Sequence, residues 1–249
     1  MSQPAPTNKT GGVRRKMEIT AEGLALFEDM ADFAGTAEYT TVTGPGWLIE
    51  IISLTSGEFA FASEAKLVRS STPRFGILLP PFSIVRFCLR DAHFHLTGLT
   101  GRGAFPQPGP RPSALFEIDP DEQLTSAAEI FAALQKPREH QPIEVNTRPS
   151  RLSLRGKKTI DAAYHTELKI AQVAEVAGVS HAHLTRQFRR DYGLSPIDYC
   201  RRLRAADASA RLVFGEKIIE VSQEVGFNDL SRFYKQFRQK LGTSPGRCK

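Results

Sequence analysis

Near its C-terminal end the chain twice places basic and hydrogen-bonding side chains at helical spacing. The two stripes are Ala182, Thr185, Arg186 and Arg189, and Ser231, Tyr234, Lys235 and Arg238. Steps of three and four residues put such side chains on one face of a helix. Arg or Lys early in such a helix can pair with guanine O6 and N7, and Thr suits a thymine methyl group. The stripes therefore predict a surface that binds nucleic acid.

Two further roles are expected around these stripes. Arg189 and Arg238 suit phosphate contacts, which position a protein on DNA without reading its sequence. Ser180 and Asn228 stand at expected helix N-caps, where a side-chain oxygen accepts from free backbone N–H groups, and both are candidate DNA contacts. One basic stripe alone is more often a solvated helix face, but two at corresponding positions favour DNA binding.

The stripes belong to an internal repeat with an offset of 48 residues, which becomes 49 after a one-residue insertion. Each copy has a small residue, Ala174 or Ser222, where two helices must approach closely. A glycine follows, Gly178 or Gly226, suited to the left-handed turn after a helix. This is the spacing of a DNA-binding helix-turn-helix.

The segment between the copies, Pro196–Leu212, has strong helix propensity and Pro at its first position. One continuous helix there would hold the two copies rigidly. If their second helices lie about 34 Å apart, one turn of B-DNA, both can enter successive major grooves. A single chain would then do what other helix-turn-helix proteins do as dimers.

The charge is divided unevenly along the 249 residues. Residues 1–150 hold 14 Lys and Arg against 17 Asp and Glu, whereas residues 151–249 hold 19 against 10, for a total formal charge of +6. This division indicates two domains with different partners. The basic part favours a polyanion, nucleic acid ahead of an acidic membrane surface.

The N-terminal part alternates short β-prone runs with turns, which predicts a small antiparallel barrel or sandwich. The expected strands are Glu38–Val42, Trp47–Leu54, Glu58–Ala62, Lys66–Ser70, Phe75–Leu79, Ser83–Leu89, His93–Thr97 and Ala114–Ile118. Six aromatic side chains could line an apolar pocket but are rather expected in the core: Trp47, Phe59, Phe61, Phe75, Phe82 and Phe87. A helical stripe follows that packs on this barrel, forms a dimer seam, or does both: Leu124, Ala127, Phe131 and Leu134.

These patterns divide the chain into five segments. We expect a disordered arm at 1–16, a β-rich sensor or dimerisation domain at 17–119, an amphipathic helix at 120–136, a linker at 137–156 and a DNA-binding domain at 157–249. No apolar run is long enough to span a bilayer, and no secretory signal is recognisable. With only three scattered cysteines, a reducing, cytoplasmic location is expected.

Residues from about 158 onward resemble the DNA-binding domain of AraC/XylS-type transcriptional regulators. The matching pieces are Ala174…Gly178-Val-Ser180, Leu184…Phe188, Gly193-Leu-Ser-Pro196…Tyr199, Arg204…Ala208 and Val225-Gly-Phe-Asn-Asp-Leu-Ser-Arg-Phe233…Phe237…Gly242-Thr-Ser-Pro245. Two positions depart from the family pattern: Ser222, a minor packing change, and Arg211 in place of the usual Leu, which is expected to loosen the helix between the copies. The resemblance implies base-reading positions at Ala182, Thr185, Arg186, Ser231 and Lys235.

The resemblance also implies what precedes this domain. Family members often carry a cupin-like barrel that binds a small effector, and RNA polymerase is implied as a partner. In cupin enzymes a His-x-His pair joins a carboxylate and a further His around a metal. Here His93 and His95 share a strand face, but the next acidic residue is Glu117 and the next histidine is His140. We therefore expect no metal, no cofactor and no catalytic residue.

Together these observations predict an α+β chain of two domains, a cupin-like β-barrel followed by an all-α double helix-turn-helix domain. It would be a bacterial-type regulator, an activator by resemblance, that binds promoter DNA as a homodimer without membrane contact. Two alternatives stay open: a metal-dependent cupin enzyme fused to a DNA-binding domain, and a ligand-free constitutive dimer. The residues leave open the effector, the promoters and the choice between activation and repression.

Overall fold

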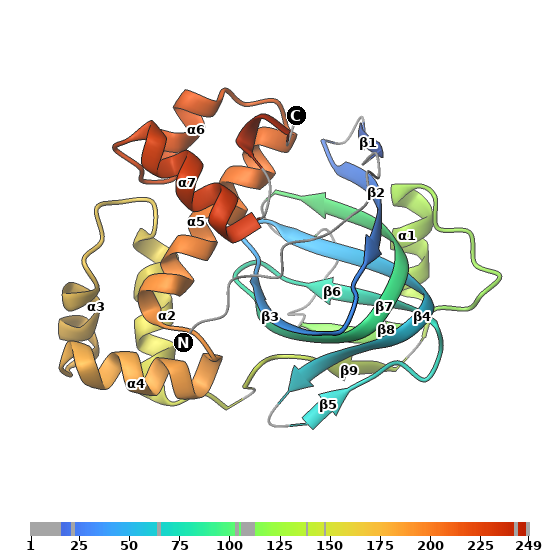
Figure 1. The fold of residues 1–249 in the computed structure, drawn as a ribbon, viewed down its shortest axis with the longest axis horizontal. Coiled ribbons are helices and arrows are strands. Elements are labelled where there is room, and N and C mark those ends of the chain that lie inside the picture. The colour runs from blue at the N-terminus through green and yellow to red at the C-terminus, as the bar shows by residue number, and fades with distance from the viewer. Residues whose placement is uncertain are drawn as a thin grey trace.

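The computed structural model describes residues 16–20, 23–63, 66–102, 105, 113–137, 139–146, 148–241 and 244–247. A β-sheet domain lies beside a group of helices, and the helix α1 (Ala127–Gln135) covers one side of the sheet (Figure 1). The arm expected at 1–16 lies outside the described residues, except that Lys16 opens the first strand.

The described strands form one antiparallel sheet with the order β1-β2-β7-β4-β6-β8-β9, to which β3 adds on β7 and β5 adds on β4. The strands are β1 Lys16–Ile19, β2 Ala25–Asp32, β3 Thr36–Val42, β4 Trp47–Ser63, β5 Lys66–Val68, β6 Arg74–Leu79, β7 Ile84–Gly101, β8 Ala114–Glu117 and β9 His140–Pro142. The path is open, because no pairing among the described strands joins β1 to β9. A sheet-rich domain was expected correctly; closure into a barrel is not observed.

Two long strands replace four expected short ones. The β4 strand runs through the expected turn after Leu54, where the register against β7 shifts between Leu54 and Ser56 and again before Glu58. Gly57 sits at this irregularity with φ of +80°, and a Cβ there would collide with backbone atoms of Asp91. The polar, glycine-containing segment therefore bends a continuous strand instead of ending it.

Two apolar clusters fill the sheet domain. Five of the six aromatic residues considered for a pocket are buried in these clusters; Phe82 is the exception. The helix α1 (Ala127–Gln135) also packs there, and its Phe131 ring lies 5.8 Å from Trp47 between centroids. Since Leu124 and Leu134 are buried in the same cluster, the expected stripe packs on its own domain.

The remaining helices form two cores that share one long helix. They are α2 Arg151–Ala163, α3 Ile170–Ala177, α4 His181–Tyr192, α5 Pro196–Val213, α6 Ile218–Glu224 and α7 Leu230–Leu241. The first core joins α2, α3 and α4 to the beginning of α5, and the second joins its end to α6 and α7. The expected continuous helix between the copies is thus present.

The segment expected as a linker, 137–156, is partly regular structure. It contains β9, which pairs with β8, and the start of α2, whose N-cap Ser150 accepts from the Ser153 N–H. Because β9 is short and its pairing is with a strand about 25 residues away, local periodicity gives no signal for it.

The sheet domain and the first helical core are packed together. Val42 and Ile84 are buried in the same cluster as α2, α3 and α4. The Arg202 guanidinium on α5 donates to the Thr40 carbonyl at 2.6 Å. Burial lowers the pKa of Arg202. Helices among the described residues are all too short or too polar to cross a bilayer.

Candidate nucleic-acid interface

The first stripe lies on α4, with its side chains directed away from the core. Leu184 and Phe188 of this helix are fully buried, as expected. On the other side Ala182, Arg186 and Arg189 are exposed and Thr185 is half-buried. The sequence therefore predicted both faces of this helix correctly.

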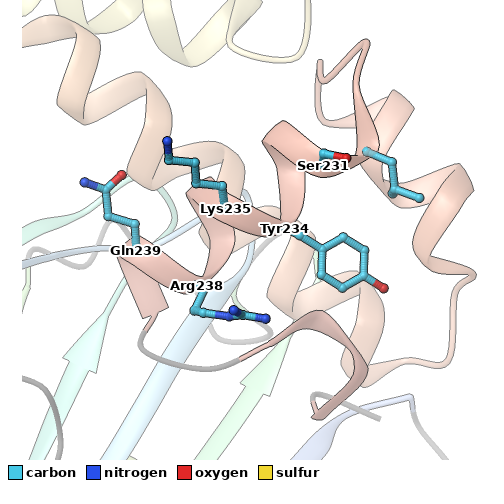
Figure 2. A pocket seen from close by; sticks show the side chains of 6 residues that line it. Ser231, Tyr234, Lys235, Arg238 and Gln239 are labelled. Atoms are coloured by element: carbon cyan, nitrogen blue, oxygen red, sulfur yellow. The ribbon is translucent and has the colours of Figure 1, made fainter.

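The second stripe lies on α7 and borders a shallow hollow of about 720 Å³. Figure 2 shows Ser231, Tyr234, Lys235, Arg238 and Gln239 rising from this one helix. All four residues expected in the stripe are thus brought together. Gln239 was missed, although it lies four residues after Lys235 and its helical spacing could have indicated it. Phe233 and Phe237 are buried beneath, as expected.

The cationic side chains of both stripes have no polar partner within the described part of the chain. Within the described residues, no ion pair or side-chain hydrogen bond involves Arg186, Arg189, Lys235 or Arg238. By contrast, the neighbouring Arg190 approaches Asp191 at 3.7 Å and Lys240 approaches Asp198 at 3.1 Å. The stripe cations are therefore available to an external polyanion, whereas their neighbours stabilise the domain.

The turns between paired helices have the expected glycines. Gly178 ends α3 with φ of +77°, and Gly226 follows α6 with φ of +89°. Ala174 and Ser222, the small residues of the two copies, are both buried. Each copy is thus a helix-turn-helix of the expected form.

One of the two expected N-caps is wrong. Ser180 caps α4, since its hydroxyl accepts from the His183 N–H at 3.3 Å. In the second copy the carboxylate of Asp229, not the Asn228 side chain, accepts from the Arg232 N–H at 2.5 Å. The one-residue insertion explains the difference, because Asp229 is the position that follows Ser180 by 49 residues. Asn228 is exposed one residue earlier.

Arg204 on α5 connects the two helix-turn-helix copies. Its guanidinium donates to the carbonyls of Tyr164 at 2.6 Å, Thr166 at 2.7 Å and Gly226 at 2.7 Å. Two of these carbonyls follow α2, just before the first copy begins at α3, and the third lies in the turn of the second copy. A Cβ on Gly226 would stand 2.7 Å from the His165 carbonyl oxygen, so the copies approach closely here. Arg204 therefore fixes the second turn against the first copy.

Arg211 was expected to weaken the packing of α5, but in the structure it forms ion pairs there. It pairs with the buried Asp207 at 3.2 Å, with Glu216 at 3.3 Å and with Glu224 on α6. Burial disfavours its charge, but Asp207 and the two glutamates outweigh this and raise the pKa of Arg211. The Tyr164 hydroxyl donates to the same Asp207 at 2.8 Å. Arg211 therefore ties α5 to α6.

The expected histidine pair does not gather further ligands. His93 and His95 are exposed on β7, and the His93 Nδ1 lies 3.0 Å from an Asp32 carboxylate oxygen. Within the described residues, no group of three or more His, Cys, Asp or Glu could hold a metal ion.

Comparison with known proteins agrees with this geometry. Residues 173–249 match the helix-turn-helix domain family. The Msm operon regulatory protein of Streptococcus mutans is 32% identical over 93 residues, 36% of this chain and 33% of that protein. The lactose operon transcription activator of Staphylococcus xylosus is 29% identical over 86 residues, 34% of this chain and 31% of that protein. The chain thus matches about a third of the length of these relatives.

Two solved structures of bacterial proteins are among those that match parts of this chain. The C-terminal domain of the response regulator AraT from Geobacillus stearothermophilus has a TM-score of 0.40 at 26% identity, over 41% of this chain and 86% of that one. ToxT from Vibrio cholerae O395 has a TM-score of 0.49 at 14% identity, over 88% and 95% of the two chains.

The family match makes residues 173–249 a helix-turn-helix domain, and each of its two copies carries one of the exposed stripes. Over these residues the match supports the resemblance to AraC/XylS-type regulators.

Proposed function

We propose that the chain is a sequence-specific transcriptional regulator whose α4 and α7 enter successive major grooves of promoter DNA. The observation that carries the proposal is the pair of matched stripes, whose cations are exposed on both helices and make no ion pair or side-chain hydrogen bond within the described residues. Arg186 and Lys235 would read bases, with Ala182, Thr185 and Ser231 beside them. Arg189 and Arg238 would contact phosphates, as would Tyr234 within the second stripe. Ser180 and Asn228, which precede the two stripes, would do the same.

For the sheet domain we propose a cupin-like sensor or dimerisation role. Its contiguous packing against the first helical core supports this proposal, because a change in one domain would reach the other. We place the domain boundary between Val145 and Ser150, since α2 begins directly after Ser150. DNA and, through the family, RNA polymerase are the proposed partners, with a homodimer as the acting species and the cytoplasm as its location.

Selection of bound duplexes from a random-sequence pool by the full chain tests this function. We expect one enriched site in which two short motifs are spaced by about one helical turn. Arg186→Ala should then cost roughly 1–3 kcal/mol at that site and relax base preference in one motif.

Two variants accompany that measurement. Arg189→Ala should weaken all duplexes alike and reduce the salt dependence of binding by about one unit of slope. Arg155→Ala removes an exposed cation from α2, outside both stripes, and should leave affinity nearly unchanged. Unaltered affinity and base preference in Arg186→Ala would show that α4 does not read this site.

A further inference from the structure

A pocket of about 350 Å³ lies where the sheet domain, the segment before α2 and the first helix-turn-helix meet. Its walls come from the turn between β6 and β7, from residues 144–146, from Pro149, from α2 and from Tyr192. Tyr192 is the last residue of α4, the helix that carries the first stripe. The volume falls within the range of small-molecule sites.

One polar group in this pocket is left without a partner. Tyr192 is only 5% exposed, and among the residues that the structure describes its hydroxyl has no hydrogen-bond partner. Buried hydroxyl groups are nearly always satisfied, so an exception marks a place where an external group can bind. Burial, together with the negative charges of Asp191, Asp161 and Glu144, raises the pKa of this phenol. The hydroxyl therefore lies in a negative field.

The two carboxylates that line the pocket differ in their partners. Asp161 accepts from the Lys157 ammonium at 2.8 Å and from the Tyr199 hydroxyl at 2.5 Å. Glu144 is half-buried, and burial raises its pKa despite the attraction of Lys157 and a hydrogen bond with the Ser113 backbone. Burial raises the pKa of Asp161 as well, and Lys158 also lines the pocket. Because Asp161 already accepts from two side chains, the Glu144 carboxylate is the one left to accept from a bound cation.

The opposite wall is apolar and held in an unusual backbone conformation. Pro80, Pro81, Phe82 and Ile84 line it. Phe82 has φ of +60°, a region that bulky residues rarely adopt and that is common at functional sites. The Phe82 amide N–H donates a hydrogen bond to the Gly44 carbonyl oxygen at 3.0 Å. An apolar body can therefore pack here while a polar head reaches Glu144 and Tyr192.

We infer that this pocket binds a small organic cation, an amine or amidine on an apolar body. The cationic head would donate to the Glu144 carboxylate and to the Tyr192 oxygen, and the body would lie against Phe82 and Ile84. Because such a ligand touches the sheet domain and the end of α4 together, its binding would stabilise their contact. As a regulatory site this rests on the proposed function; as a binding site it stands alone.

Isothermal titration calorimetry of the full chain, without DNA, tests the inference with benzylamine and benzamidine. Benzyl alcohol and benzoate serve as neutral and anionic probes of similar shape. We expect the two cations to bind with dissociation constants of roughly 10 mM or lower, and the other two probes about tenfold more weakly.

Three variants complete the experiment. Tyr192→Phe keeps the ring and Glu144→Gln keeps the shape, so both should fold and each should weaken the cations about tenfold. Glu175→Gln changes an exposed carboxylate on α3 and should bind them like the parent chain. Absence of binding heat, equal binding of benzoate, or unchanged binding in Tyr192→Phe and Glu144→Gln would overturn the inference. DNA binding is measured on the same protein. If it binds DNA but none of the cations, the inferred pocket is wrong and the proposed function stands.

Discussion

At the scale of single residues, sequence patterns predicted the two stripes correctly but only one of the two helix N-caps. The faces of α4 and α7 follow from helical spacing, because buried Leu184 and Phe188 leave only one side for the cations. The N-cap of α7 does not follow as readily, since Asn228 and Asp229 are both good cap residues. Only the geometry decides that the Asp229 carboxylate accepts from the Arg232 N–H.

The corrected cap can be measured directly. Asp229→Ala removes the acceptor at the start of α7 and a negative charge that favours a helix N-terminus, so it should destabilise the domain by about 1 kcal/mol. Asn228→Ala is the matched control and should change stability by less than about 0.5 kcal/mol. Urea unfolding followed by circular dichroism gives both values. Equal losses of unfolding free energy in the two variants would contradict the assignment of Asp229 as the N-cap.

At the scale of elements, the helices were easier to predict than the strands. The α5 helix follows from its uninterrupted helix-forming sequence and its leading Pro196. The β2 strand was not expected, because the charged residues of Ala25–Asp32 weaken its β signal and its pairing with β7 lies far along the chain. The joined strand β4 was also missed, since Gly57 signals a turn locally while β7 pairs on both sides of it.

The arrangement of the two helix-turn-helix copies depends on Arg204, and this gives a prediction. Arg204→Gln removes hydrogen bonds to two carbonyls between α2 and α3 and to one in the turn of the second copy, so stability should fall by roughly 2–3 kcal/mol. The copies should also lose their fixed orientation. Binding to a duplex with both motifs should then weaken at least tenfold, while binding to a duplex with one motif changes little. Band-shift titrations measure both.

Arg201→Gln is the control for that prediction. Arg201 and Arg204 both line a hollow of about 280 Å³ beside the turn at Gly226, but the Arg201 side chain makes no hydrogen bond or ion pair within the described residues. It should therefore retain the advantage of the duplex with both motifs. If Arg204→Gln retains this advantage too, the orientation of the copies is set by their apolar packing on α5 instead.

At the scale of the whole molecule, the sheet domain and the helical domain are packed against each other more closely than a linker implies. The sequence predicted two domains of opposite charge, and the structure adds an apolar core that crosses the boundary at Val42 and Ile84. Ion pairs add to this contact, since Arg102 after β7 approaches Glu216 before α6 at 2.5 Å. Such contacts join residues distant in sequence, so no local pattern predicts them.

Gly44 provides the sharpest test of this joint. It is buried, and a Cβ there would stand 3.0 Å from the Asp207 backbone nitrogen of α5. Gly44→Val should push α5 away from the sheet domain and cost roughly 1–3 kcal/mol. Because the shared core would open, calorimetric unfolding should change from one cooperative transition to two. Gly246→Val is the control, because a Cβ at that position meets no atom within 4 Å, and it should leave a single transition. Two transitions already in the parent chain would mean that the domains unfold independently and that the shared core contributes little to their stability.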